Sequence, residues 1–513
     1  MDPAETMQAV IQSKGMQPER SVRRNTRWLR FAMLVWLLSM LVVQGGGAPS
    51  AQRRQTQLDW ESGALKLTAT DVVRSVRAYL SDANDMRRYY AYASALLGRP
   101  YYGYYVRSAE SWQQQFRAGT KPPSDDSALV CPMRPLVPYR DYLIEYPPGV
   151  LLVTVPPALL LPSGDYGDAY DLLFLIEMIV TMGVSIQLAL RLRRHLPKLA
   201  RSELRFDAAM WWACAIGCFA LGTVVTHRFD PVVALLLVGL ALAVFDSRWF
   251  LSGVLLSLAT ICKGVPLLLA PLWLWFLWVR TAEQTAAERF SALGRVVLGG
   301  LLCGLAFVIP LYISSGLSML DALRYHGERP LQLESTGAAL LGTLQALYPG
   351  TLRSTVSYGS ANVVTIGSSL IGLEWMLLRM QGPAVLAGLI GTLSYCSYRR
   401  RSMDSLNQEA MTAELVLRSV CLLMVVFMVS GRVFSPQYLT WIIPLGIFLS
   451  LRVSTGLTAL FLLLLALSQI IVSALGGPML QIRAWAFGIL LARNLLLFVW
   501  GVRLLRARIS RAS

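Results

Sequence analysis

The sequence predicts an all-α polytopic membrane protein, a bundle of about 12 transmembrane helices. Of its 513 residues, 55% are hydrophobic and only 15% are charged, and the mean hydropathy is +0.50. A soluble chain of this length would carry far more charge. Apolar runs long enough to cross a bilayer recur from residue 29 to the C-terminus, so the hydrophobic residues are expected to form spans.

The basic residues indicate a membrane partner. The net charge of +17 lies mainly at the ends of the apolar runs and in short loops, not in a separate basic domain. This placement is typical of topology signals and of contacts with anionic lipids. We therefore expect membrane lipids as partners and no nucleic acid.

The N-terminal segment sets the expected orientation. Residues 1–28 contain a cluster of arginines just before the apolar run 29–45, and the positive-inside rule places that tail in the cytoplasm. The run ends in Gly-Gly-Gly without a clear cleavage site, so we expect an uncleaved first span. Residues 50–141 then form a long first extracytoplasmic loop, which its length exempts from the charge rule.

Residues 146–162 are expected to stay on the outer side as a re-entrant or interfacial helix. This run is short and contains four prolines, and the next run, 169–190, ends in a basic cluster typical of the cytoplasmic side. If 169–190 runs inward, 146–162 cannot cross. Such broken structure is tolerated at membrane depth only where protein or a cavity covers it.

The remaining apolar runs alternate in direction. They are 208–225, 231–246, 249–262, 265–279, 296–315, 383–398, 414–430, 438–450, 454–475 and 484–502. A second extracytoplasmic loop, 316–382, holds an apolar piece at 363–380 that is expected at the interface. The membrane domain therefore covers 29–502, residues 503–513 form a basic tail, and both termini are expected in the cytoplasm.

Lys263 is the first candidate for a functional residue. It is the only charged residue between Trp249 and Trp278, and no other lysine follows Lys198. An ammonium in such a segment is costly unless it faces a cavity, a partner or an anion. Snorkelling would explain it only at the very end of the span, so we expect Lys263 to serve a binding site.

Several polar groups fall at the predicted extracytoplasmic ends of the spans. They are Asp85 with Tyr89 and Tyr90; Arg140, Asp141 and Glu145; His227, Arg228 and Asp230; Lys263; and Arg324 to Glu334 with Arg432, Ser435, Gln437 and Tyr438. These residues were not used to set the orientation, so their agreement indicates a shared site. Basic side chains with few carboxylates suit a phosphate-bearing ligand, and a ligand buried in the bilayer implies a lipid phosphate.

Each polar group also has a structural interpretation. Tyr89 and Tyr90 could belong to an interfacial aromatic belt. The Arg228 to Asp230 turn, and Glu145 before the Pro-Pro turn, could cap helices. The charges between Arg324 and Glu334, with His326 among them, could pair on a solvated loop.

The order of these motifs resembles glycosyltransferase family 87. The motifs are DMRRYY at 85–90, ALLG at 95–98, PY at 100–101, YLIEYPPG at 142–149, RFD at 228–230, KGVP at 263–266, RPLQ at 329–332, ES at 334–335 and SPQY at 435–438. They cover roughly residues 70–450, and the set is specific although no single motif is. Members include the mycobacterial polyprenyl-phosphate-mannose-dependent alpha-1,2-mannosyltransferases.

The resemblance implies a GT-C fold with its active site on the extracytoplasmic side. It implies inverting transfer of a hexose, with mannose as the first expectation, from a polyprenyl-phosphate donor to a hydroxyl of a lipid-linked or cell-envelope glycan. The expected location is the bacterial cytoplasmic (inner) membrane. One departure from the family is the extra segment 106–138, which bears on the substrate more than on the chemistry.

The resemblance also suggests roles, because an inverting transfer needs a base near the acceptor and positive charge near the departing phosphate. Asp85 is the expected base, with Asp82 as the fallback. The candidates to hold the phosphate are Lys263, His326, Arg329 and Arg432, and His326 could also protonate it. Glu145 and Asp230 would orient the basic residues, among them Arg228. Gln332 and Gln437 would bind sugar hydroxyls. Tyr89 and Tyr90 would stack on sugar faces.

We expect neither a metal nor a cofactor. The sequence has no Asp-x-Asp pair in an external loop, no HExxH motif, no Gly-rich nucleotide loop and only three widely separated histidines. Cys214 and Cys218 stand at i and i+4 without a histidine or carboxylate, so packing is the better interpretation. Only Cys131 lies in the first loop, which excludes an internal disulfide there.

Two other functions fit a membrane protein with buried charge. A transporter or lipid flippase would place polar residues near the midplane and show paired repeats, whereas here the charges gather at one face and no repeat is evident. A GT-C-like glycan ligase or polymerase with a diphosphate-linked donor would depend on a late external loop. The first loop is at least as rich in candidate residues here.

Overall fold

The computed structural model describes residues 84–99, 106–107, 129–130, 135–162, 167–198, 203–358, 360–403 and 408–508. The predicted first span 29–45, the N-terminal tail, Asp82 and most of the 106–138 segment lie outside the described residues.

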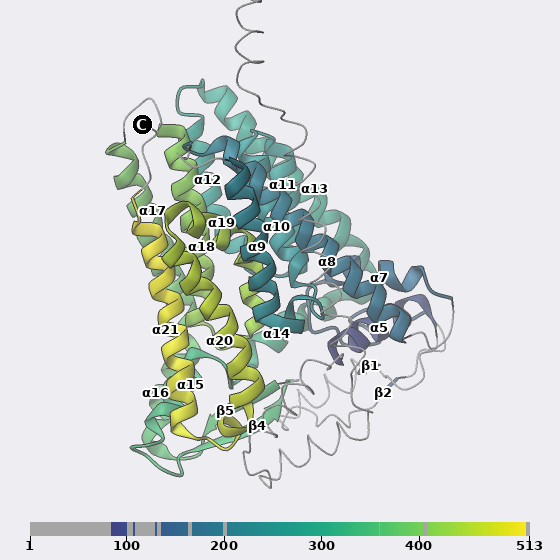
Figure 1. Cartoon of the computed structure of the whole chain (residues 1–513). Coiled ribbons are helices and arrows are strands. Elements are labelled where there is room, and N and C mark those ends of the chain that lie inside the picture. Colours follow the sequence, from purple (N-terminus) through teal and green to yellow (C-terminus); the bar gives the residue numbers. More distant parts are fainter. Residues whose placement is uncertain are drawn as a thin grey trace, which may run out of the picture.

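Helices dominate the described chain (Figure 1). They are α5 (Asn84–Leu97), α7 (Val150–Leu159), α8 (Gly167–Arg191), α9 (Glu203–Leu221), α10 (Asp230–Phe245), α11 (Trp249–Cys262), α12 (Ala270–Arg280), α13 (Ala286–Ser315), α14 (Asp321–Glu328), α15 (Thr336–Leu344), α16 (Ser368–Arg379), α17 (Gln381–Arg401), α18 (Gln408–Ser430), α19 (Ile443–Val453), α20 (Thr455–Leu480) and α21 (Ala484–Arg506). The predicted class, an all-α polytopic membrane protein, is confirmed.

The predicted count of about 12 spans includes short apolar helices and the run 29–45, which lies outside the described residues. Among the described helices, 6 are long and apolar enough to cross a membrane, or 7 if the bent pair α16 and α17 counts as one span. The difference lies partly in short apolar helices such as α10 and α11, which have 16 and 14 residues. At 1.5 Å per residue, α10 is about 24 Å long, less than the ~30 Å hydrocarbon core. Sequence hydropathy alone does not reveal that these helices are shorter than a full span. The α10 helix begins at Asp230, and α11 ends just before Lys263.

The segment 146–162 contains one short helix, and its place on the outer side of the membrane stays a prediction. It forms α7, which has 10 residues and two internal prolines, and such a helix is only about 15 Å long.

The second loop has more structure than the sequence indicated. It contains α14, α15, α16 and a three-stranded antiparallel sheet in the order β3 (Leu331–Gln332), β5 (Ser360–Thr365), β4 (Leu352–Ser357). In this sheet Val363 of β5 stands opposite both Leu331 and Ser354. The apolar piece 363–380 is divided between the end of β5 and α16. A separate two-stranded ladder joins β1 (Val106–Arg107) and β2 (Leu129–Val130).

The ends of the helices form two groups, one at each end of the bundle (Figure 1). Residues predicted to be cytoplasmic meet at one end, here called the basic end, through the ion pairs Arg194–Asp246 at 2.6 Å, Arg280–Glu409 at 2.9 Å and Arg452–Glu414 at 2.8 Å. The β4–β5 hairpin, α15 and α16 gather at the opposite end, here called the site end (Figure 1). Which end faces the cytoplasm remains a prediction.

Two glycines bring α11 and α13 into backbone contact. A Cβ atom on Gly253 would lie 1.9 Å from the carbonyl oxygen of Val296, and one on Gly299 would lie 2.1 Å from that of Phe250. Most of the remaining surface of α13 is exposed and apolar, as expected for a lipid-facing helix.

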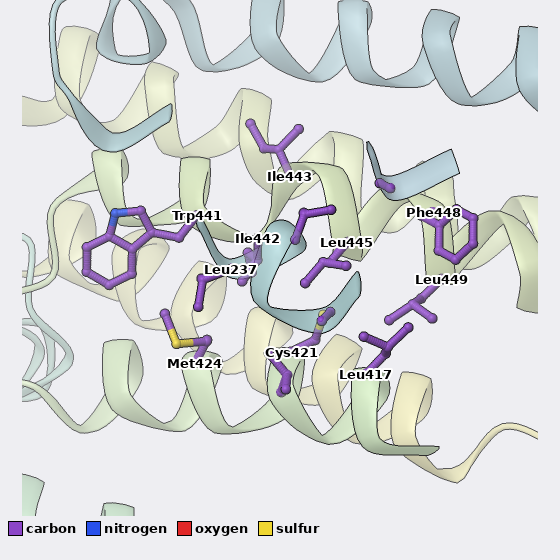
Figure 2. Close-up of a cluster of buried hydrophobic side chains, with 14 of the residues drawn as sticks. Leu237, Leu417, Cys421, Met424, Trp441, Ile442, Ile443, Leu445, Phe448 and Leu449 are labelled. Carbon is purple, nitrogen blue, oxygen red and sulfur yellow. The ribbon is translucent and has the colours of Figure 1, made fainter. Parts of the chain in front are cut away.

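The largest core joins α10, α18 and α19. Figure 2 shows Leu237, Leu417, Cys421 and Met424 facing the segment that runs from Trp441 to Leu449, with Trp441 at one end of the row and Phe448 at the other. Cys214 and Cys218 are buried in the same core, which agrees with packing. The core therefore leads directly to Trp441, whose indole reaches the site.

Candidate functional site

Lys263 is buried in an ion pair with Asp230. Its Nζ lies 3.1 Å from Oδ1 of Asp230, and the two residues are 8% and 0% exposed. Asp230 is the first residue of α10 and Lys263 directly follows α11, so the pair joins the ends of two short helices. A close partner of this kind offsets the desolvation cost of both charges.

Aromatic rings enclose this lysine. Its Nζ lies 4.7 Å from the ring centre of Phe229, 5.3 Å from Tyr146, and 5.5 Å from both Tyr438 and Trp441. Cation–π attraction adds to the ion pair at such distances. Lys263 is thus held from several sides.

Asp230 keeps one oxygen available. Its Oδ1 accepts hydrogen bonds from Lys263 and from Nε1 of Trp441. Its Oδ2 is buried and has no hydrogen-bond partner among the described residues. Since buried carboxylate oxygens are normally satisfied, Oδ2 can accept a donor from a ligand such as a sugar hydroxyl.

Asp85 meets the same cluster through Arg228. The two side chains form an ion pair and are 20% and 27% exposed. Nη1 of Arg228 also lies 3.4 Å from the hydroxyl of Tyr146. The carboxylate of the first loop therefore stands beside the RFD turn, only two residues from Asp230, and the predicted convergence is observed.

Glu145 links α5 to α14. Its Oε2 accepts from Nη1 of Arg88 at 3.1 Å, and its backbone oxygen lies 2.8 Å from Nε2 of His326. A carbonyl only accepts, so Nε2 of His326 carries the proton and is already used. Only Nδ1 of His326 remains for a substrate, which limits its predicted role as a proton donor.

The YPPG turn is fixed against α11. Gly149 N donates to Ile261 O at 2.7 Å. A Cβ atom on Gly149 would lie 2.7 Å from the backbone of Ile261 and Cys262, so this approach requires glycine. The contact places the turn that carries Tyr146 beside Lys263.

Arg432 is held by backbone carbonyls, and its role as a phosphate ligand stays a prediction. Its guanidinium donates to the carbonyls of Gly327 and Leu378, the latter at 2.7 Å. Its own carbonyl accepts from Gln332 N at 2.9 Å. Arg329 donates from Nη2 to Ser360 at 2.7 Å, but its buried Nε has no partner in the described ranges, so Arg329 stays a candidate.

Tyr89 and Tyr90 are core residues, contrary to the prediction that they stack on sugars. The α5 helix packs against α7 and α8, which turns both rings inward. Tyr89 lies against Tyr146, Phe174 and Phe229. Tyr90 is 2% exposed and stacks on Tyr170 at 4.6 Å, so neither ring offers a face to a sugar.

The two predicted glutamines lie at the site end with open acceptor atoms. Gln332 donates from Nε2 to Glu334 at 3.3 Å, and Gln437 is largely buried. In both, Oε1 is buried without a partner in the described part of the chain. Their role in binding sugar hydroxyls stays a prediction.

The sequence analysis did not identify Arg493 as a candidate site residue and gave no role to Glu334. Arg493 is 1% exposed, and none of its three guanidinium nitrogens has a hydrogen-bond partner among the described residues. It is the only charged residue in the predicted span 484–502, so the argument applied to Lys263 would have found it. Burial raises the pKa of Glu334 to about 7, although the charges of Arg493 and Arg228 lower it in part.

The bundle and its polar cluster define a membrane protein with a charged site at one end of its helices. Residues 143–312 match the model of glycosyltransferase family 87, which confirms the resemblance drawn from the motifs. The matched range contains Glu145, the RFD turn and Lys263, whereas Asp85 and Arg493 lie outside it. The coarse class that follows is a membrane glycosyltransferase.

Among solved structures, the chain is weakly similar to ArnT from Cupriavidus metallidurans. The form bound to undecaprenyl phosphate shows 13% identity and a TM-score of 0.34, over 85% of this chain and 77% of ArnT. The apo form shows 14% identity and a TM-score of 0.36, over 82% and 74%. No curated protein matches the sequence.

Proposed function

We propose that this protein is an inverting hexosyltransferase of the bacterial inner membrane. It would move a sugar, mannose by the family resemblance, from a polyprenyl-phosphate donor to a hydroxyl of a lipid-linked or cell-envelope glycan on the extracytoplasmic side. One observation carries the proposal: the Asp85–Arg228 pair stands beside the Asp230–Lys263 pair, which joins the first-loop carboxylate to the family 87 segment.

Asp85 acts as the general base in this proposal. Its carboxylate takes the proton of the acceptor hydroxyl while the hydroxyl oxygen attacks the anomeric carbon of the donor. The bond between that carbon and the phosphate oxygen breaks, and the electron pair leaves with the polyprenyl phosphate. Attack from the opposite face inverts the anomeric configuration.

Arg228 couples the two halves of this step. Asp85 becomes neutral when it gains the proton, and its ion pair with the guanidinium of Arg228 weakens. The charge of Arg228 is then available when negative charge develops on the leaving phosphate. Cationic side chains can neutralise a monophosphate in this way, so the proposal calls for no metal.

Lys263 is assigned a positioning role in place of the predicted phosphate contact. Its charge is matched by Asp230 and its ammonium is enclosed by rings. The pair holds the RFD turn, and with it Arg228, while Oδ2 of Asp230 is open to a sugar hydroxyl.

The test uses purified protein in nanodiscs with polyprenyl-phosphate mannose, glucose and arabinose, and membrane lipids as acceptors. Asp85→Asn should lower turnover by about 10²–10⁴-fold, the usual contribution of a general base. Asp168→Asn is the matched control, because Asp168 pairs with Arg87 of the same α5 helix but is fully exposed outside the cluster. Full turnover in Asp85→Asn would reject Asp85 as the base.

The same preparation distinguishes the alternatives. Movement of a fluorescent prenyl phosphate across proteoliposomes without any glycosidic product would indicate a flippase. Turnover only with a diphosphate-linked donor would indicate a ligase-type enzyme. Either result would replace the proposed reaction.

A further inference from the structure

Arg493 is a buried cation that the described residues do not satisfy. It lies on α21, and its nitrogens Nε, Nη1 and Nη2 are all buried without hydrogen-bond partners in the described chain. The centre of the Phe434 ring lies 4.6 Å from its guanidinium carbon. Five N–H donors in a low-dielectric environment are costly to leave unpaired, which indicates that a ligand supplies the acceptors.

The N-terminus of α15 adjoins this arginine. The neighbouring Asn494 donates from Nδ2 to Oγ1 of Thr336 at 3.1 Å, which joins α21 to the first residue of α15. Ser335 caps α15 by accepting from Ala338 N at 3.1 Å. In a helix the N–H groups of the first residues, here Thr336 and Gly337, have no partner within the helix, and together with the helix dipole they favour an anion.

Glu334 lies next to this place in the chain. Glu334 directly precedes the cap residue Ser335, and its carboxyl is sensitive to the charges of both Arg493 and Arg228. Arg228 in turn pairs with Asp85. The α15 N-terminus therefore adjoins Glu334, a carboxyl whose pKa the charges of both Arg493 and Arg228 lower.

We propose that Arg493 and the N-terminus of α15 form a subsite for the phosphate of the polyprenyl carrier; this choice of ligand rests on the proposed function. A guanidinium offers the two parallel donors that suit phosphoryl oxygens. Arg493 stands nine residues into α21, about 14 Å along its axis. That depth favours a phosphate delivered on a lipid chain over an ion from solution.

Binding of farnesyl phosphate to the purified full-length protein, with no sugar present, tests the subsite separately from catalysis. Arg493→Met should weaken binding by at least about tenfold, as expected when a charge-assisted contact is lost. Arg503→Gln is the control, since Arg503 lies on the same helix but is exposed, and it should bind as the wild type does. Vesicles with phosphatidylglycerol form a second arm.

Stability separates a binding role from a structural one. Because the apo protein buries this cation without a hydrogen-bond partner in the described chain, Arg493→Met should leave the apo melting temperature unchanged or raise it. A fall of more than about 5 °C would show that the fold needs the guanidinium and would overturn the proposal. Wild-type affinity for farnesyl phosphate in Arg493→Met, or Arg493-dependent binding of phosphatidylglycerol instead, would also overturn it. Arg493-dependent binding of farnesyl phosphate by a protein that transfers no sugar would support the subsite and reject the proposed function.

Discussion

Both ends of the bundle bury charged side chains, but these side chains differ in how completely they are hydrogen-bonded. At the basic end, Glu414 accepts from Arg418 through Oε1 and from Arg452 through Oε2, the latter at 2.8 Å. Arg418 also donates to Ala507 O, and Arg452 to Pro197 O at 2.8 Å. Only Nε of Arg418 and Nη1 of Arg452 remain without a partner in the described chain. This network ties four segments together and leaves little for a ligand.

At the site end, the buried charges are left partly unmatched. One oxygen of Asp230 and the whole guanidinium of Arg493 have no partner in the part of the chain that is described. Both ends give the same signal in sequence, a charge inside an apolar run. The comparison teaches that unsatisfied hydrogen-bonding capacity, and not burial of charge alone, distinguishes a binding site from a structural lock.

The largest effect is expected at the basic end. Glu414→Gln leaves two buried guanidinium groups without their anion and should lower the free energy of unfolding by about 3–5 kcal/mol. Thermal and denaturant unfolding in detergent would measure it. Glu409→Gln is the control on the same helix, since Glu409 pairs with Arg280 at an exposed position and should change stability by less than about 1 kcal/mol. Equal effects of the two would contradict the structural lock.

A slightly smaller effect is expected from Lys263→Met. Asp230 would lose its buried partner, and the free energy of unfolding should fall by about 2–4 kcal/mol. The double variant Asp230→Asn, Lys263→Met removes both charges and should recover most of that stability without recovering turnover. Lys198→Met changes the exposed lysine and serves as the control. Failure of the double variant to recover stability would show that the pair is not the reason for the loss.

Gly149→Ala should have an intermediate effect, localised to the site end. The added methyl group meets the backbone of Ile261 and Cys262, and relieving that overlap should cost about 1–3 kcal/mol and shift the Lys263 turn. Turnover should therefore fall with the melting temperature. Gly264→Ala is a close control, because nothing lies within 4 Å of a Cβ atom there. A Gly149→Ala enzyme with normal stability and turnover would disprove the tight contact.

The smallest effect concerns the pH dependence of stability. Because the pKa of Glu334 is raised to about 7 from 4.5, the folded protein favours the protonated carboxyl. Its contribution is fully present below the unfolded pKa and is lost as the pH rises through about 7, so the wild type should lose about 1 kcal/mol between about pH 5 and pH 8. Melting curves should show Glu334→Gln lacking this loss, and the exposed control Glu328→Gln retaining it. A parallel pH dependence in wild type and Glu334→Gln would remove Glu334 as the source.

Hydropathy and charge in the sequence were enough to predict which residues share an end of the bundle. Asp85, Arg228, Asp230 and Lys263 meet as predicted, because span direction alone brings those ends together. The sequence could not predict how a side chain is oriented at that end.

The orientations of two side chains show this limit. Tyr90 faces the core because α5 packs on α8, and Arg432 is occupied by carbonyls from segments far away in the chain. Hydropathy also gives no sign of where an apolar helix ends early, as α10 and α11 do. Arg493 was predictable in principle, since it interrupts an apolar run as Lys263 does.

The glycine crossing between α11 and α13 has a consequence for variation in this enzyme. The lysine turn stands at the tip of α11, so the tilt of that helix determines where the ammonium lies. Gly253 and Gly299 allow the lipid-facing helix α13 to contact the α11 backbone directly. A single methyl group at either position would force the two helices apart. A change on the lipid-facing side of the protein would then shift the Asp230–Lys263 pair through the angle of one helix.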